Sequence, residues 1–135
     1  MWELLNLIML ILMAIIVYNI KTDDYTSHPN NFYIGRPSVL SNPFTHDGKR
    51  SSLAKLSFKT REEAINAYEE YFHKMMEVDI EFQMEFNKIY EKYKNGEDVY
   101  LGCFCAPLKC HGDIIAKELQ KKLIMERKKE RVTKK

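Results

Sequence analysis

The sequence predicts an α/β fold, with a short parallel sheet and flanking helices in one small domain. Three observations support this prediction. Residues 14–20 form a short β-branched apolar segment, residues 60–95 carry apolar side chains at helical spacing, and residues 99–113 pass from a strand pattern through a tight loop into a helix pattern. With 135 residues, the chain is long enough for one domain with a modest core and too short for two.

The first 20 residues are far more apolar than the rest of the chain. They contain 17 apolar side chains, and a membrane-spanning helix needs roughly 17 to 25 such residues. One hypothesis is therefore an N-terminal transmembrane helix, with membrane association through residues 1–20. A cleavable signal sequence is disfavoured, because no Lys or Arg precedes the apolar run.

A second hypothesis divides this block. Residues 14–20 are β-branched and are followed by the polar residues 21–31, which is typical of a buried strand. Residues 1–13 are then an apolar leader, residues 14–124 are the domain, and residues 125–135 are a basic helical tail. The two hypotheses compete, because a membrane span that includes residues 14–20 removes the first strand from the sheet.

The middle of the chain is predicted to be a short strand, a loop and a long helical segment. Residues 32–34 are compatible with the strand, and residues 45–59 read as loop because they carry Gly, several Ser and basic side chains. Thr60 and Glu63 form a capping box at the start of the helical segment. Tyr, Phe and Met side chains recur along it and are predicted to face the core. The segment 60–95 is long for one helix, so we expect a break near residues 77–79.

The end of the chain is predicted to be a buried strand followed by a helix. Residues 99–105 are the strongest strand candidate, and residues 113–131 form the C-terminal helix. Residues 117–135 hold nine Lys and Arg against three Glu. This basic end can contact nucleic acid or an anionic membrane by charge alone.

The main group of reactive side chains lies at the predicted junction of this strand and helix. Cys110, His111, Gly112 and Asp113 occupy the helix N-terminus, where free N–H groups and the helix dipole bind anions and lower the pKa of a thiol. We predict Cys110, His111 and Asp113 as catalytic candidates, with Cys110 as the nucleophile beside His111. Gly112 is predicted to let the backbone approach a ligand. Asp113 can equally be the N-cap of the helix.

A second group of candidate ligand-binding residues follows the strand at 32–34. Arg36 can bind a phosphate or carboxylate through two N–H groups. Ser38 and Asn42 offer neutral donors and acceptors, and Gly35 ends the strand beside them. The alternative is a rigid loop in which Asn42 hydrogen-bonds backbone groups.

The three cysteines leave a zinc site as an alternative. Cys103, Cys105, Cys110 and His111 are suitable ligand types, but structural zinc sites usually use two pairs of ligands separated by a longer loop, so no metal is favoured. Cys103 and Cys105 are otherwise small apolar residues of a core strand. Three clustered cysteines do not make a paired disulfide framework, and they fit a reducing compartment.

Taken in chain order, these segments resemble a known family. The motifs are V-Y-N-I at 17–20, Y-I-G-R-P-S at 33–38 with N-P-F at 42–44, T-R-E-E-A-I at 60–65, and L-G-C-F-C-A-P at 101–107 with C-H-G-D at 110–113. This pattern is similar to a small phage- and bacteria-associated family catalogued as domain of unknown function 4326. The resemblance covers roughly residues 15–124 and implies a compact α/β domain in a viral or mobile-element setting. It implies no activity, and the chain departs from the family pattern at Ser41, where Gly is usual.

The leading functional hypothesis is a binding domain for a compact anionic ligand, such as a nucleotide or a derivative. The ligand is expected between the Gly-Arg-Pro-Ser loop at 35–38 and the helix start at 110–113, in the host cytoplasm. No cofactor is predicted, zinc is possible, and enzymatic activity is left open. The alternative function is a zinc-stabilised interaction module, tethered to a membrane if residues 1–20 form an anchor.

Overall fold

The computed structural model describes residues 14–45 except 24 and 26, residues 56–57, residues 60–106 and residues 108–133. Along the chain its elements are β1 (Ile15–Asn19), β2 (Asn31–Tyr33), β3 (Phe44–Thr45), β4 (Leu56–Ser57), α2 (Arg61–Val78), α3 (Ile80–Lys94), β5 (Val99–Cys103) and α4 (His111–Thr133).

The main sheet has the strand order β1-β5-β2, and both pairings are parallel. β5 is the central strand, with Val17 of β1 and Phe32 of β2 both in register with Leu101. Val99 and Leu101 are fully buried on the face that packs against the helices. This arrangement confirms the predicted α/β fold with a short parallel sheet and flanking helices.

The apolar front block contains the first strand. Residues 15–19 pair with β5 along their whole length, which confirms the strand hypothesis for that half of the block. Residues 1–13 lie outside the described residues. No helix in the described part of the chain combines the length and the apolar character that a membrane span requires.

The segment predicted to be a loop at residues 45–59 contains a short additional pairing. Phe44 and Thr45 of β3 pair in parallel with Leu56 and Ser57 of β4. The prediction of loop was therefore wrong at residues 45, 56 and 57. The polar and Gly-containing composition of the segment gave no strand periodicity from which such a brief ladder could be read.

The predicted break in the long helical segment occurs at Asp79. Its backbone is extended, with φ −118° and ψ 111°, and its Oδ1 atom accepts a hydrogen bond from the Phe82 N–H at 2.9 Å, so the same residue ends α2 and caps α3. Tyr68 and Phe72 are buried as predicted, but Ile80 and Met84 are 74% and 56% exposed. Ile89 and Tyr93, further along the same predicted stripe, are buried as expected, so the break at Asp79 displaces the stripe only in the first part of α3.

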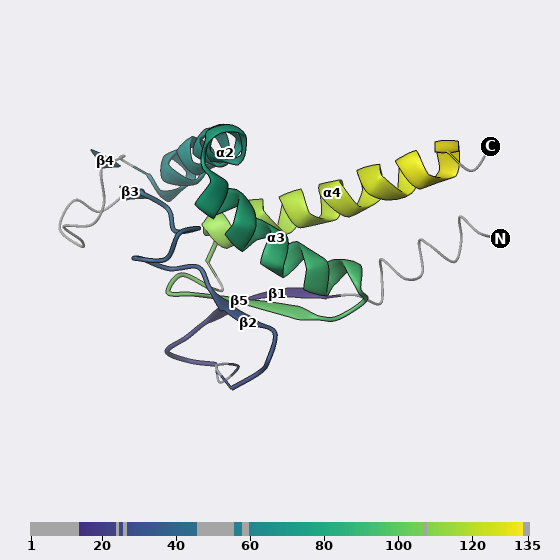
Figure 1. Cartoon of the computed structure of the whole chain (residues 1–135). Coiled ribbons are helices and arrows are strands. Elements are labelled where there is room, and N and C mark those ends of the chain that lie inside the picture. The colour runs from purple at the N-terminus through teal and green to yellow at the C-terminus, as the bar shows by residue number, and fades with distance from the viewer. Residues whose placement is uncertain are drawn as a thin grey trace.

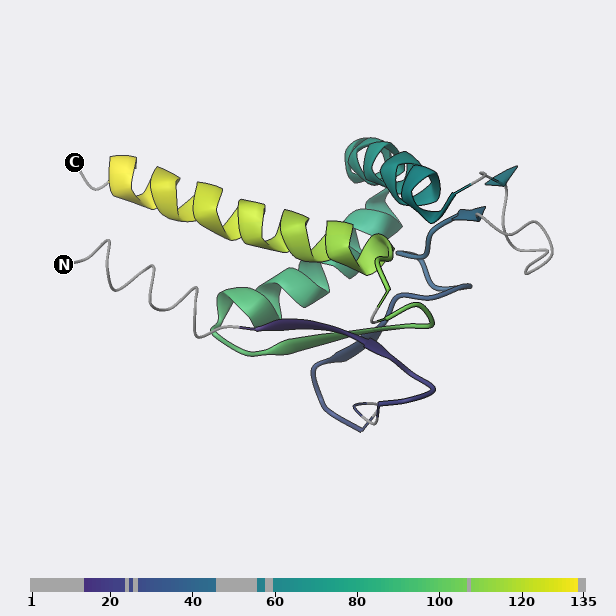
Figure 2. The same cartoon turned by 180° about the vertical axis from the view of Figure 1, so that it is seen from behind.

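The helices cover one face of the sheet. Figures 1 and 2 show α2, α3 and α4 on the same side, with α4 in contact with both α2 and β1. The connection between β1 and β2 covers the other face, where Tyr25 stacks on Tyr100 with ring centroids 4.6 Å apart. Because the three strands are parallel, their carboxyl ends lie at one edge, and the start of α4 follows β5 at that edge.

Candidate functional site

The start of α4 is a capping box in which a cysteine occupies the usual place of Ser or Thr. The Cys110 Sγ atom accepts a hydrogen bond from the Gly112 N–H at 3.2 Å, and Asp113 Oδ2 accepts one from the Cys110 N–H at 3.1 Å. These reciprocal bonds satisfy N–H groups that a helix N-terminus leaves without partners. The predicted helix start at 113 was therefore two residues late, because Cys110 rather than Asp113 is the N-cap.

Cys110 also contacts Cys103 at the end of β5. Their Sγ atoms lie 3.5 Å apart, and both thiols are buried and free. The hydrogen bond from Cys110, helped by the backbone N–H groups of Cys105 and Ala106, lowers the pKa of Cys103 to about 6 despite its burial. The pKa of Cys110 is raised instead, because its S–H group donates to Cys103 and because it is buried. Because either sulfur atom can be the donor of this bond, the low thiol pKa belongs to the pair of Cys103 and Cys110 rather than to Cys110 alone.

His111 connects the helix start to the residue that follows β2. Its Nε2 atom donates a hydrogen bond of 2.6 Å to the carbonyl oxygen of Ile34, which fixes the proton on Nε2 in the neutral ring. Burial lowers the pKa of His111 to about 4, and the nearby charge of Arg36 acts in the same direction. The Tyr68 ring packs against this imidazole in a T-shaped arrangement, with ring centroids 5.1 Å apart. At neutral pH His111 is an uncharged donor, and it holds the predicted halves of the site together.

The loop after β2 is braced by the side chains that the sequence singled out. Arg36 donates from Nε to the Asn42 carbonyl and from Nη2 to the Phe44 carbonyl, both at 2.9 Å. The Asn42 amide donates to the Ala64 carbonyl at 3.3 Å, and its Oδ1 atom accepts from the Phe44 N–H at 2.9 Å. These bonds match the rigid-loop alternative for Asn42. They also hold the guanidinium group in a fixed position.

Ser38 and Gly35 do not brace the described part of this loop by side-chain hydrogen bonds, as Arg36 and Asn42 do. The Ser38 Oγ atom is buried and has no hydrogen-bond partner among the described residues. An added Cβ at Gly35 would lie 2.5 Å from the Tyr33 hydroxyl, which donates to the Arg36 carbonyl at 2.6 Å. Gly35 thus allows the tyrosine to fold over the loop, and the Ser38 hydroxyl keeps unused hydrogen-bonding capacity.

Gly112 allows a close approach of α4 to the sheet. An added Cβ there would lie 2.9 Å from Val17 Cγ1, 3.0 Å from Ile34 Cδ1 and 3.2 Å from the Cys110 sulfur. The backbone at Gly112 is buried against protein atoms, so its small size serves the packing of helix on sheet. Its predicted contact with a ligand stays a prediction, as do the catalytic roles of Cys110, His111 and Asp113.

The same family is found by comparison with family models. A model described as "Domain of unknown function (DUF4326)" matches residues 18–121, more than half of the chain. The chain belongs to the DUF4326 family. The match runs from β1 into α4 and so includes both halves of the candidate site. Comparison with curated proteins and with solved structures gives no match.

Within the described part of this DUF4326 domain, possible metal ligands gather away from the thiols. The group with at least three closely placed ligand atoms consists of Glu69, His73 and Glu118. The predicted zinc ligands do not form such a group among the described residues. Cys103 contacts Cys110, whereas the Nε2 atom of His111 is bonded to the Ile34 carbonyl. Sequence reasoning missed the Glu-His-Glu group, for which the only local signal is the four-residue spacing of Glu69 and His73 on one helix face.

Proposed function

We propose that the domain binds a compact anionic ligand, a nucleotide or a derivative, at the carboxyl edge of its sheet. The observation that supports this most directly is the hydrogen bond of 2.6 Å between His111 and the Ile34 carbonyl. It joins the start of α4 to the loop that carries Arg36. The guanidinium charge and the positive end of the helix dipole thus act on the same region, where an anion is stabilised by both.

Arg36 is suited to this role by the way its loop holds it. Two of its nitrogen atoms are bonded to the Asn42 and Phe44 carbonyls, while Nη1 has no hydrogen bond to the residues that the structure describes. A guanidinium group fixed in this way loses little conformational entropy when a ligand binds. The buried Ser38 hydroxyl offers a second polar contact in the same loop, since an unsatisfied hydroxyl is costly unless something hydrogen-bonds it.

Titration calorimetry of the full chain against nucleotides, their nucleosides and inorganic phosphate tests this proposal. We expect the phosphorylated compounds to bind, with affinity lost in Arg36→Gln and reduced in Ser38→Ala. Lys74→Ala is the matched control, because it removes an exposed positive charge from α2. Circular dichroism of each variant checks that the loop change has not unfolded the domain. Undiminished binding by a folded Arg36→Gln variant would reject the proposed site.

A second candidate function, thiol chemistry at the same edge, is supported by the distance of 3.5 Å between the Cys103 and Cys110 sulfur atoms. A Cys103 thiolate is the nucleophile in this scheme, and the Cys110 S–H group is its hydrogen-bond donor. Because Cys105 is the more exposed thiol, alkylation by a small electrophile is followed at residue 103 by mass spectrometry; modification of Cys103 should be slowed by Cys110→Ala and unchanged by Cys105→Ser. Equal slowing by both variants would contradict it.

The setting and the basic tail complete the proposal. A reducing cytoplasm, in a viral or phage context, suits a site built on free thiols.

The basic residues 125–135 are proposed to contact nucleic acid or an anionic membrane by charge. Within the described part of α4 no side chain after Leu123 is buried, so the basic side chains there are accessible to a partner. Binding to duplex DNA and to anionic vesicles at increasing salt distinguishes the two partners, and no binding to either contradicts the role.

A further inference from the structure

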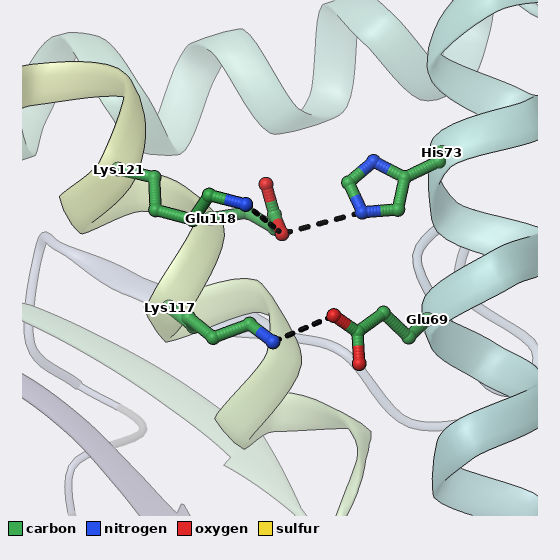
Figure 3. A network of polar contacts seen from close by, with 5 residues as sticks. All are labelled: Glu69, His73, Lys117, Glu118 and Lys121. Atoms are coloured by element: carbon green, nitrogen blue, oxygen red, sulfur yellow. Dashed lines mark hydrogen bonds and ion pairs between the residues drawn. The ribbon is translucent and has the colours of Figure 1, made fainter. Parts of the chain in front are cut away.

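Three potential metal ligands face one another between α2 and α4. Figure 3 shows Glu69 and His73 projecting from α2 towards Glu118 of α4. One oxygen of each carboxylate and one ring nitrogen of the histidine lie within 4.8 Å of one another. The four-residue spacing of Glu69 and His73 places them on the same face of α2, and the packing of α4 on that face brings the third residue.

Glu118 is the most informative member of this group. Its side chain is only 11% exposed, and its Oε1 atom is buried without a hydrogen bond. The distance from this atom to His73 Nε2 is 3.4 Å, longer than usual for a charge-assisted hydrogen bond. In a tetrahedral zinc site with bonds of about 2.0–2.1 Å, neighbouring ligand atoms are about 3.3–3.4 Å apart. The separation of these two atoms therefore fits an edge of such a site.

We propose that His73, Glu69 and Glu118 bind a divalent transition-metal ion of the Zn²⁺ type, which links α2 to α4. One imidazole and two carboxylates favour zinc, cobalt or nickel over magnesium or calcium, which prefer oxygen ligands alone. Three protein ligands leave the fourth tetrahedral position for water. Glu118 lies seven residues beyond His111, about 10 Å along the helix axis, so this site is separate from the proposed anion site.

Two lysines compete with the ion for the carboxylates. Lys117 Nζ lies 2.6 Å from Glu69 Oε1, and Lys121 Nζ lies 3.5 Å from Glu118 Oε1 (Figure 3). Both lysine side chains are about half exposed, at 47% and 54%, so they can turn into solvent when a metal ion replaces them. Their positive charges oppose the ion, so removing Lys117 should strengthen metal binding by about tenfold. If these residues form only an ion-pair network, Lys117→Ala should lose the contact with Glu69 and should not strengthen metal binding.

Titration of the full chain with Zn²⁺, and with Co²⁺ followed by its absorption spectrum, tests the site. His73→Gln and Glu118→Gln should each weaken Zn²⁺ binding by at least about tenfold, since even outer-shell partners of a metal are worth that much. Zn²⁺ should raise the thermal midpoint of the wild type and not that of His73→Gln. Glu70→Gln, an exposed residue of the same helix, is the matched control and should bind like the wild type.

Two results would overturn the proposed metal site, and a third would overturn the competition by Lys117. Equal Zn²⁺ affinity in the wild type and in folded His73→Gln would exclude the imidazole as a ligand. Thiolate-to-cobalt charge-transfer bands would place the metal on the cysteines instead. No strengthening of binding in Lys117→Ala would show that the lysine does not compete for the carboxylates. Each result leaves the nucleotide measurements on Arg36 unaffected.

Discussion

Replacing Gly112 by Ala tests whether this residue is needed for the packing of α4 on the sheet. The added Cβ would meet Val17 Cγ1 at 2.9 Å and Ile34 Cδ1 at 3.0 Å. The isoleucine methyl is the flexible end of its side chain, but Val17 is β-branched and belongs to β1, so it cannot turn away easily. Overpacking costs roughly 1–3 kcal/mol, and Ala recovers about 1 kcal/mol of helix propensity, so we expect a net loss of about 1 kcal/mol and at most about 2.

Urea unfolding of the wild type, Gly112→Ala, Val17→Ala and the double variant measures this contact. Without Cγ1 of Val17 the new methyl group has room, so Gly112→Ala should be neutral or stabilising in that background. The coupling free energy between the two positions should be about 1–2 kcal/mol and favourable to the double variant. Gly96→Ala is the comparison for strain, because Gly96 has φ +88° and no atom near its added Cβ. Additive effects at positions 17 and 112 would refute the packing argument.

Three further changes have defined outcomes. Because the pKa of His111 is about 4 when folded and about 6.5 when unfolded, the unfolded chain takes up the proton first as the pH falls. As the pH falls from 7.5 to 5, protonation of His111 should therefore lower the free energy of unfolding of the wild type by about 2 kcal/mol. A folded His111→Gln variant should lack this loss, and an equal loss in the variant would contradict the argument. Cys110→Ala should raise the pKa of Cys103 from about 6 towards the ordinary thiol value, measured by the ultraviolet absorbance of the thiolate, whereas an unshifted titration would assign the effect to backbone N–H groups. Thr60→Ala should cost about 1 kcal/mol in urea unfolding, because the Thr60 hydroxyl oxygen caps the Glu63 N–H at 3.1 Å, and unchanged stability would show that this cap is dispensable.

The strands and helix breaks were predictable where the local chemistry is unambiguous. Residues 15–19 of the β-branched segment predicted at 14–20 form β1, and the apolar run beginning at Val99 forms β5. The break near residues 77–79 occurs at Asp79, because a short acidic side chain there can cap the helix that follows. In each case the information lies within a few residues of the element.

The parts of the site that depend on packing between distant elements could not be read in this way. A thiol is not among the preferred N-cap groups, so the sequence pointed to Asp113, and α4 begins earlier than expected. The bond from His111 to the Ile34 carbonyl joins groups 77 residues apart. Glu118 likewise reaches Glu69 and His73 only because α4 packs on α2. The sequence pattern of one segment does not specify which distant segment it will contact.

The central position of β5 affects how the protein is made. Among the strands that the structure describes, β1 and β2 pair in the main sheet with β5 alone, and Ala14 bonds to Asp98, 84 residues later in the chain. At about 5–20 residues per second, a ribosome needs about 4–17 s to add those residues. Throughout that interval the apolar strand Ile15–Asn19 waits in the nascent chain with its edges unpaired, where it can aggregate or be held by a chaperone. Translation thus delivers the strand that completes the sheet long after the two strands that flank it, and assembly of the main sheet begins only after β5 emerges.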